Sequence, residues 1–403
     1  MSGWGKKCAL TAGSVTLSLF AGEIALRTML PQIAWHVESD TSLGWSSREY
    51  KRFNPTVGRG STRTHRILFL GDSNLAGSGG LGSLDERFPI VLGQRLADRA
   101  EVQILASGGW GTDQQLLAFL QKGRHWRPDI VVLTFTAYND LANVLSNSSQ
   151  PRHRKPYFAL DPTTETLQLF DTHGALLAQR ARKFDQQGVL ASHLIDLIRF
   201  QLARVKAKPA ARSDATSPAP QVDPRYLLYS QFLSQEIGLK RTAQLRQLQA
   251  ELDWSPQNGV NNVSAYIAED FELNRYAWQL LEAILLDLKR EVEATEAQLI
   301  VMLLPIPFDP RDPQTIPGGD FERVFATPTG SFTFRAGEPR ERLSAICSRA
   351  GIEFFDPTQR FIETVISEDR VEAYWPVPHN THLSSLGHAK LAEILQEYLA
   401  SRR

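Results

Sequence analysis

Ser73 stands at the end of a buried strand, where it could act as a nucleophile. Residues 66–71 read Arg-Ile-Leu-Phe-Leu-Gly and run directly into Asp72 and Ser73. An apolar run without alternation predicts a strand buried on both faces, and open α/β sheets bind ligands at the carboxyl ends of such strands. The pattern predicts a serine held on a rigid strand tip, as covalent catalysis requires. An ordinary strand-to-helix turn with Asp72 or Ser73 as its N-cap has the same pattern.

Three further segments could complete the chemistry of a serine nucleophile. A hydroxyl needs a base to take its proton, and His382, just before the last predicted helix, is the candidate. The oxyanion of an acyl transfer needs hydrogen-bond donors. The backbone N–H of Ser73, that of Gly109 (or its neighbour Gly108) and the side-chain amide of Asn139 could supply them. Together these residues predict acyl transfer through a covalent intermediate.

The arrangement resembles the four sequence blocks of the SGNH (GDSL) hydrolase superfamily. Gly71-Asp72-Ser73, Gly109, Asn139-Asp140 and His382 occur in the order of those blocks, and the resemblance covers about residues 65–145 and 265–400. The apolar leader and a long insertion are similar to the membrane-anchored bacterial branch with acetyltransferase-like members. The resemblance implies a flavodoxin-like fold and ester hydrolysis or acyl transfer without a cofactor. It also implies that the serine is the nucleophile, the glycine and asparagine are oxyanion donors, and the histidine is the base.

Two positions depart from the pattern of that family. Ala137 stands where the third block usually begins with glycine. His379 and Asn380 stand where the family has an aspartate three or two residues before the catalytic histidine. An asparagine can orient an imidazole but cannot stabilise the imidazolium by charge, and in a serine protease that exchange lowers turnover by roughly 10⁴. The sequence therefore predicts a Ser-His dyad, a Ser-His-Asn variant or a weakened enzyme, unless Asp369 or Glu372 supplies an acid.

Alternating strands and helices predict the sheet that positions these residues. The apolar patterns predict strands over 65–70, 102–106, 129–136, 298–304 and 352–355, and helices over 88–99, 114–122, 271–294 and 389–399. Strands that alternate with helices indicate a parallel sheet covered on both faces, a three-layer α/β/α sandwich. A large, mostly helical insertion over 145–265 follows the third strand. We expect it to hold a hairpin near 158–170 and helices over 189–205 and 233–252.

The first 64 residues are expected to lie outside this domain. Lys6 and Lys7 precede an apolar run over residues 8–21, which predicts a signal anchor or signal peptide over residues 1–30. A buried N-terminal helix is the alternative. Residues 31–64 are polar and read as a linker to a hydrolase domain over 65–403. Lysines before the run place the main domain outside the inner membrane of a bacterial cell envelope.

Composition narrows the classes of function. Lys+Arg and Asp+Glu each number 44, so the chain has no net charge and no electrostatic signature of nucleic-acid binding. The two cysteines, Cys8 and Cys347, give no disulfide framework.

Two rival interpretations of these residues stay open. His379, His382 and His388 are three potential metal ligands, although their spacing matches no common zinc pattern. A binding or scaffold protein of the envelope that has lost its acid is the non-enzymatic alternative. The sequence favours a cofactor-free, metal-free serine esterase or O-acyltransferase acting on acyl esters, with acetyl groups on envelope or secreted glycans as candidate substrates.

Overall fold

The computed structural model describes Ser18 and a set of ranges in the rest of the chain. These ranges are 37–40, 42–56, 65–77, 81–146, 154–172, 174–177, 264–305, 322–327, 330–368, 371–375 and 382–402. All of them belong to one of two units, which spans residues 37–184 and 220–403. The predicted leader over 1–30, apart from Ser18, and the predicted helices over 189–205 and 233–252 lie outside the described residues. Among the helices that are described, none is long and apolar enough to cross a membrane.

Five strands form the central sheet, in the order β11-β8-β5-β3-β4. In chain order they are β3 His65–Gly71, β4 Ala100–Ala106, β5 Ile130–Phe135, β8 Gln298–Leu303 and β11 Glu353–Phe355. Every neighbouring pair is parallel. The α/β class, the parallel sheet and all five strands predicted from apolar runs are therefore confirmed.

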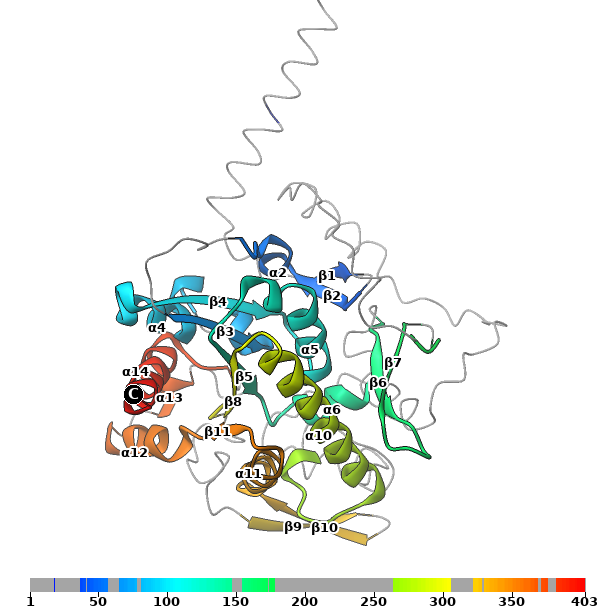
Figure 1. Cartoon of the computed structure of the whole chain (residues 1–403). Helices are drawn as coiled ribbons and strands as arrows, with labels where there is room; N and C mark the ends of the chain where they lie inside the picture. The colour runs from blue at the N-terminus through cyan, green and yellow to red at the C-terminus, as the bar shows by residue number, and fades with distance from the viewer. Residues whose placement is uncertain are drawn as a thin grey trace, which may run out of the picture. The chain divides into compact units, whose positions relative to one another are not determined.

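Helices cover both faces of this sheet (Figure 1). Leu68 and Leu70 of β3 face one hydrophobic cluster, whereas Ile67 and Phe69 face another, because successive side chains of a strand point to opposite faces. The first cluster includes α5 Thr112–Gln121, α6 Asp140–Leu145, α10 Glu272–Glu293 and α11 Glu338–Ala350. The second includes α4 Phe88–Leu96, α12 Thr358–Glu368, α13 Val371–Tyr374 and α14 Ser385–Ser401. The three-layer arrangement agrees with the prediction.

The other described elements are short. They are β1 Val37–Asp40, β2 Gly44–Ser47, α2 Arg48–Arg52, α3 Ser73–Ala76, η2 Leu84–Glu86, η3 Ala97–Arg99, η4 Gly123–Trp126, β6 Tyr157–Leu160, β7 Leu167–Phe170, η5 Ser264–Tyr266, β9 Glu322–Thr327 and β10 Gly330–Arg335. The antiparallel β6–β7 pair is the hairpin expected at the start of the insertion.

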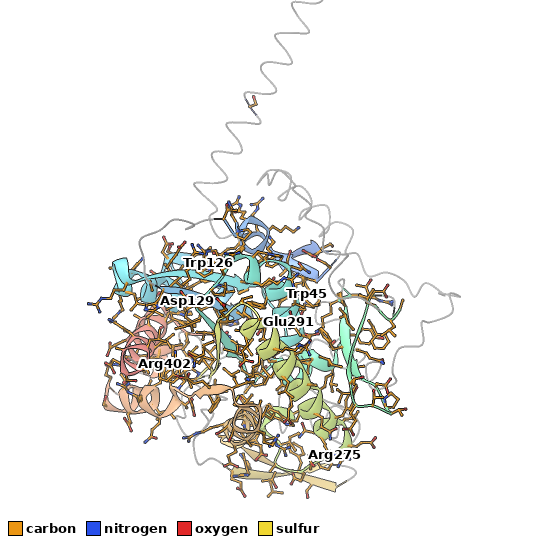
Figure 2. The ribbon with its side chains drawn as sticks, in the orientation of Figure 1. Trp45, Trp126, Asp129, Arg275, Glu291 and Arg402 are labelled. Carbon is orange, nitrogen blue, oxygen red and sulfur yellow. The ribbon has the colours of Figure 1, made fainter. Side chains whose placement is uncertain are left out.

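Part of the segment expected to be a linker instead packs into the unit that holds the central sheet. The antiparallel β1–β2 pair and α2 fall within residues 31–64. Trp45, labelled in Figure 2, is fully buried, and its indole N–H donates to the carbonyl of Gly108 at 2.9 Å. The indole of Trp110 donates in return to the carbonyl of Trp45 at 2.9 Å. Two large aromatic side chains thus fix this polar-looking segment to the loop that follows β4.

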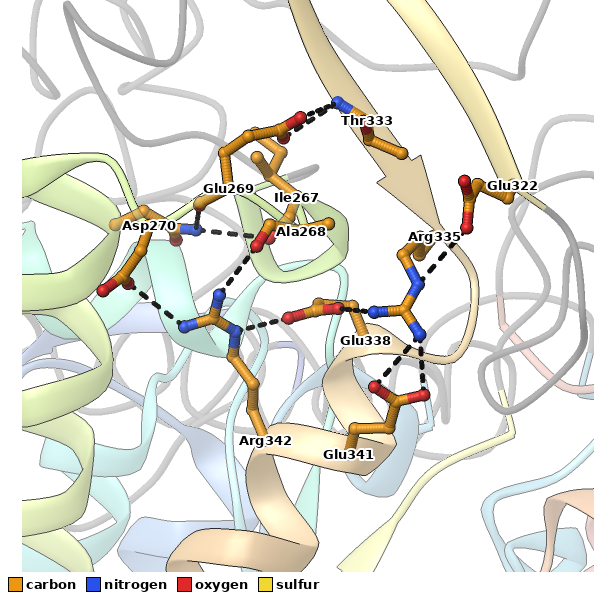
Figure 3. Close-up of polar contacts among 11 residues, drawn as sticks. Ile267, Ala268, Glu269, Asp270, Glu322, Thr333, Arg335, Glu338, Glu341 and Arg342 are labelled. Carbon is orange, nitrogen blue, oxygen red and sulfur yellow. Dashed lines mark hydrogen bonds and ion pairs between the residues drawn. The ribbon is translucent and has the colours of Figure 1, made fainter.

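A polar network fastens the β9–β10 hairpin to the start of α11 (Figure 3). The guanidinium of Arg335 lies 2.8 Å from a carboxylate oxygen of Glu338 and 2.9 Å from one of Glu341. The other carboxylate oxygen of Glu338 lies 2.7 Å from Arg342. The Glu338 side chain is 7% exposed, so this carboxylate is the buried centre of the network and the outer pairs contribute less.

Candidate active site

The structure brings Ser73 and His382 into direct contact. Ser73 is the first residue of α3, immediately after β3. His382 lies just before the N-cap of α14, Ser384. The Nε2 atom of His382 is 2.8 Å from the Oγ atom of Ser73, although 309 positions separate the two residues in the chain. This is the hydrogen-bond geometry of a nucleophile and its general base.

Close packing at the end of β3 holds the serine in place. A Cβ atom on Gly71 would lie 2.3 Å from both Leu75 Cδ1 and Thr134 Oγ1, so any larger residue would have to displace these two side chains. Asp72 then caps α3, because its Oδ1 accepts from the backbone N–H of Asn74 at 3.0 Å. The turn that delivers Ser73 is thereby fixed on both sides.

The glycine loop after β4 lies against the serine. A Cβ atom on Gly108 would be 4.0 Å from the Cβ of Ser73. Gly109 has φ +74°, a left-handed conformation that favours glycine. Its carbonyl accepts a hydrogen bond from the side-chain amide of Asn143 at 3.3 Å. A residue of α6 therefore holds the orientation of this peptide group.

Asn139 lies after β5, on the other side of β3 from the glycine loop. It is the half-buried N-cap position of α6, and its backbone N–H donates to the carbonyl of Thr136 at 3.1 Å. Its Nδ2 lies 3.4 Å from Oδ1 of Asp140. Because β4 and β5 are the two neighbours of β3, the loops that carry Gly109 and Asn139 flank the loop that carries Ser73. Ala137 is buried and has no positive φ, so this position does not require glycine.

Burial shifts the pKa values of two ionisable side chains at this edge of the sheet, His382 and Asp140. It lowers the pKa of His382, against which the Asp72 carboxylate acts in the opposite direction. It raises the pKa of Asp140 well above the usual range, and the nearby Asp72 charge adds to this shift. A neutral imidazole beside the serine hydroxyl is the state that can accept its proton.

Some predicted site residues cannot be placed. His379, Asn380 and Asp369 lie outside the described residues, and so does the side chain of Glu372 in α13. Within the described ranges, no group of three or more His, Cys, Asp or Glu side chains could hold a metal ion. Of the three histidines in the metal interpretation, His388 is buried against α4, where its Nδ1 accepts from the backbone N–H of Phe88 at 3.2 Å.

This buried histidine predicts an acid-sensitive fold. Burial lowers the pKa of His388 from 6.5 to about 3, so the unfolded chain binds the proton first as the pH falls below 6.5. At pH 5 the resulting loss of stability is about 2 kcal/mol, because 1.5 pH units separate this pH from the unfolded pKa. The His388→Asn variant keeps an acceptor for the backbone N–H of Phe88. We expect it to lack this part of the difference between the free energies of unfolding in urea at pH 7.5 and at pH 5.

The exposed His65 at the start of β3 provides the matched control. His65→Asn should leave the pH dependence of unfolding unchanged. A wild-type protein and a His388→Asn variant that lose equal stability between the two pH values would contradict the assignment of a neutral, buried His388.

Two parts of the site went unpredicted from the sequence. One is the burial of Trp45 against the glycine loop, because this tryptophan lies in a segment that was expected to be a linker. The other is a buried lysine, Lys155, which contacts α5 and α6. Nothing in the run Arg152-His153-Arg154-Lys155 marks one of its cations as buried.

Comparisons with known proteins give structural likeness only. No protein-family model matches the sequence, and no curated protein matches it. A lipase/acylhydrolase from Enterococcus faecalis is 10% identical, with 84% of this chain and 97% of that chain covered and a TM-score of 0.37. An acetyl xylan esterase is 8% identical (83% and 98% covered, TM-score 0.35). An acetyl-xylooligosaccharide esterase from Geobacillus Stearmophilus is 12% identical (84% and 95% covered, TM-score 0.37). With identities and TM-scores this low, the likeness carries no conclusion about the chemistry of this chain.

Proposed function

We propose that this chain is a serine esterase or O-acyltransferase with the site of the SGNH hydrolase superfamily, which its four sequence blocks resemble. The observation that carries the proposal is the 2.8 Å contact between Ser73 Oγ and His382 Nε2. It occurs at the carboxyl end of a parallel sheet, where such folds bind their ligands. The glycine loop after β4 lies beside the same serine.

In the proposed reaction, Ser73 Oγ attacks the carbonyl carbon of an acyl ester while His382 Nε2 takes the hydroxyl proton. The tetrahedral intermediate collapses as the ester bond breaks, and His382 gives the proton to the leaving alcohol. The acyl group is then bound to Ser73. A water molecule, or a sugar hydroxyl in a transferase, attacks this acyl-enzyme with its proton passing to His382, and the serine is restored. No cofactor enters this sequence of steps.

The oxyanion is proposed to accept hydrogen bonds from the backbone N–H groups of Ser73 and Gly109 and from the amide of Asn139. The left-handed backbone at Gly109 and the fixed Asn139 loop support these roles. Donors that are already in position cost no reorganisation when the charge develops. This arrangement also serves both halves of the reaction, since each passes through an oxyanion.

The substrate class and location are proposals that rest on the sequence. The leader over residues 1–30 supports an anchor in the inner membrane with the hydrolase unit in the periplasm or outside. The resemblance to acetyltransferase-like proteins supports acetyl esters of envelope glycans. A catalytically weakened binding protein of the envelope is the alternative, because no carboxylate stands two or three residues before His382.

The test is active-site labelling of the full chain. The purified protein is incubated with a fluorophosphonate, digested with trypsin and analysed by tandem mass spectrometry, alongside hydrolysis of p-nitrophenyl acetate. We expect one phosphonylated peptide, 67–87, with the added mass on Ser73. A folded protein that neither labels nor releases p-nitrophenol would refute the enzymatic proposal and favour the binding protein.

A further inference from the structure

Lys155 is completely buried, which is unusual for a lysine. Its Nζ lies 2.5 Å from Oδ2 of Asp113, whose side chain is also 0% exposed. The same Nζ donates to the backbone carbonyl of Asn143 at 2.7 Å. A buried cation needs partners that compensate for its lost hydration. Lys155 has one such partner in α5, Asp113, and one in α6, the carbonyl of Asn143.

The two partners of Lys155 carry the loops of the proposed oxyanion site. Asp113 is the second residue of α5, which begins directly after the glycine loop. Asn143 lies one turn beyond Asn139 in α6, and its backbone N–H donates to the carbonyl of Asn139 at 2.8 Å. The side chain of Asn143 donates to the carbonyl of Gly109 at 3.3 Å. Hydrogen bonds through Asn143 thus connect Lys155 to the backbone carbonyls of Gly109 and Asn139, two of the three proposed donor residues.

The packing around this network leaves little room for movement. A Cβ atom on Gly111 would lie 2.7 Å from Asn143 Cβ and 2.9 Å from Asp113 Oδ1. On the other side, a Cβ atom on Gly44 would lie 2.6 Å from the Cα of Lys155. The backbone at Lys155 is therefore held against β2, so that its ammonium group is presented to α5 and α6 from a fixed point.

The electrostatics agree with a pair that is held at a cost. Burial lowers the pKa of Lys155, and the Asp113 charge opposes this shift. Burial likewise raises the pKa of Asp113, opposed by Lys155. The charge of the buried Asp140, which follows Asn139, also acts to raise the pKa of this lysine. Replacing such a pair with apolar residues is often neutral or stabilising, so stability alone does not account for it.

We infer that Lys155 is a positioning residue for the proposed acyl transfer. Its ammonium group, joined to Asp113 in α5 and to the Asn143 carbonyl in α6, sets the separation of the glycine loop and the Asn139 loop. The inference rests on the proposed function and extends it. It assigns to the first residues of the insertion a task inside the site, in addition to any contact that the insertion makes with substrate.

The test removes the lysine without leaving its partner charged. Lys155→Met alone would leave the buried carboxylate of Asp113 without its cation. The informative variant is therefore the double change Lys155→Met with Asp113→Asn. We expect this variant to fold, with a circular dichroism spectrum like that of the wild type. Its kcat with p-nitrophenyl acetate should fall about 10- to 100-fold, with KM changed less than about threefold, because displaced donors weaken transition-state binding.

A second readout does not require activity. Amide hydrogen exchange of peptides covering 107–111 and 139–143 should be about tenfold faster in the double variant, while exchange in α10 stays unchanged. Lys289→Met, which breaks a surface pair with Glu293 on α10, is the control and should alter neither readout.

The outcomes separate this inference from the proposed function. A folded double variant with wild-type kcat and wild-type exchange in both loops would overturn the positioning role. A wild-type protein without labelling or turnover would refute the enzymatic proposal instead. In that case, faster exchange confined to the two loops would still support the link from Lys155 to their position.

Discussion

Ser73→Ala is expected to abolish fluorophosphonate labelling and to lower kcat for p-nitrophenyl acetate by about 10⁵- to 10⁶-fold, as loss of a catalytic serine does elsewhere. The hydroxyl that this change removes is the one bonded to His382. The fold should persist, because Asp72 rather than Ser73 caps α3. Steady-state kinetics and a urea unfolding curve on the same preparation separate lost chemistry from lost structure.

Ser367→Ala is the matched control for this experiment. Ser367 is an exposed serine of α12, where its hydroxyl donates to the backbone carbonyl of Thr364. This variant should label and turn over like the wild type. Labelling that survives in Ser73→Ala would place the nucleophile elsewhere and remove the main support for the proposed reaction.

His382→Ala is expected to cost nearly as much as the loss of the serine, since the two residues act as a unit. It should also change the pH profile. In the wild type, activity needs the neutral imidazole and is lost as the pH falls through the pKa of His382. Burial lowers that pKa, so the acid limb of kcat/KM should lie below pH 6.5. In His382→Ala this limb should disappear, and the residual rate should rise with hydroxide concentration.

The measurement is kcat/KM from pH 4.5 to pH 9 in both proteins, with stability followed in parallel because His388 makes the fold acid-sensitive. His65→Asn serves again as the control. An acid limb that persists unchanged in His382→Ala would show that another group takes the serine proton.

The sheet could be predicted because the residues of each strand are themselves a sufficient signal for a buried strand. β3, β5 and β8 each contain an apolar run, over residues 67–70, 130–133 and 299–303. Burial between two helical layers is the simplest arrangement for such runs. The contact between Ser73 and His382 was expected for a different reason: four short motifs occur in a known order at strand ends. In the structure, Nε2 of His382 lies 2.8 Å from Oγ of Ser73. The roles of Gly109 and Asn139 stay predictions until the variants are measured.

The parts that the sequence left unpredicted depend on long-range packing. Trp45 is fixed by an indole and a carbonyl more than 60 positions away. Lys155 is buried only because Asp113 and Asn143 come from two other elements. Neither the burial of Trp45 nor that of Lys155 is accompanied by a local periodicity or composition from which it could be predicted. The leader and the central part of the insertion lie outside the described residues, so those expectations remain as they were stated.

The reciprocal indole hydrogen bonds of Trp45 and Trp110 determine where the shortest stable fragment of this protein can begin. Cutting the gene at codon 65, where the first sheet strand begins, would remove the side chain that holds the Gly108 carbonyl and uncover the buried ring of Trp110. Such a shortened protein would keep Ser73 and His382. It would also expose an apolar aromatic surface on the loop after β4, and exposed apolar surface promotes aggregation. Cloning boundaries, deletion libraries and domain grafts should therefore begin upstream of Val37.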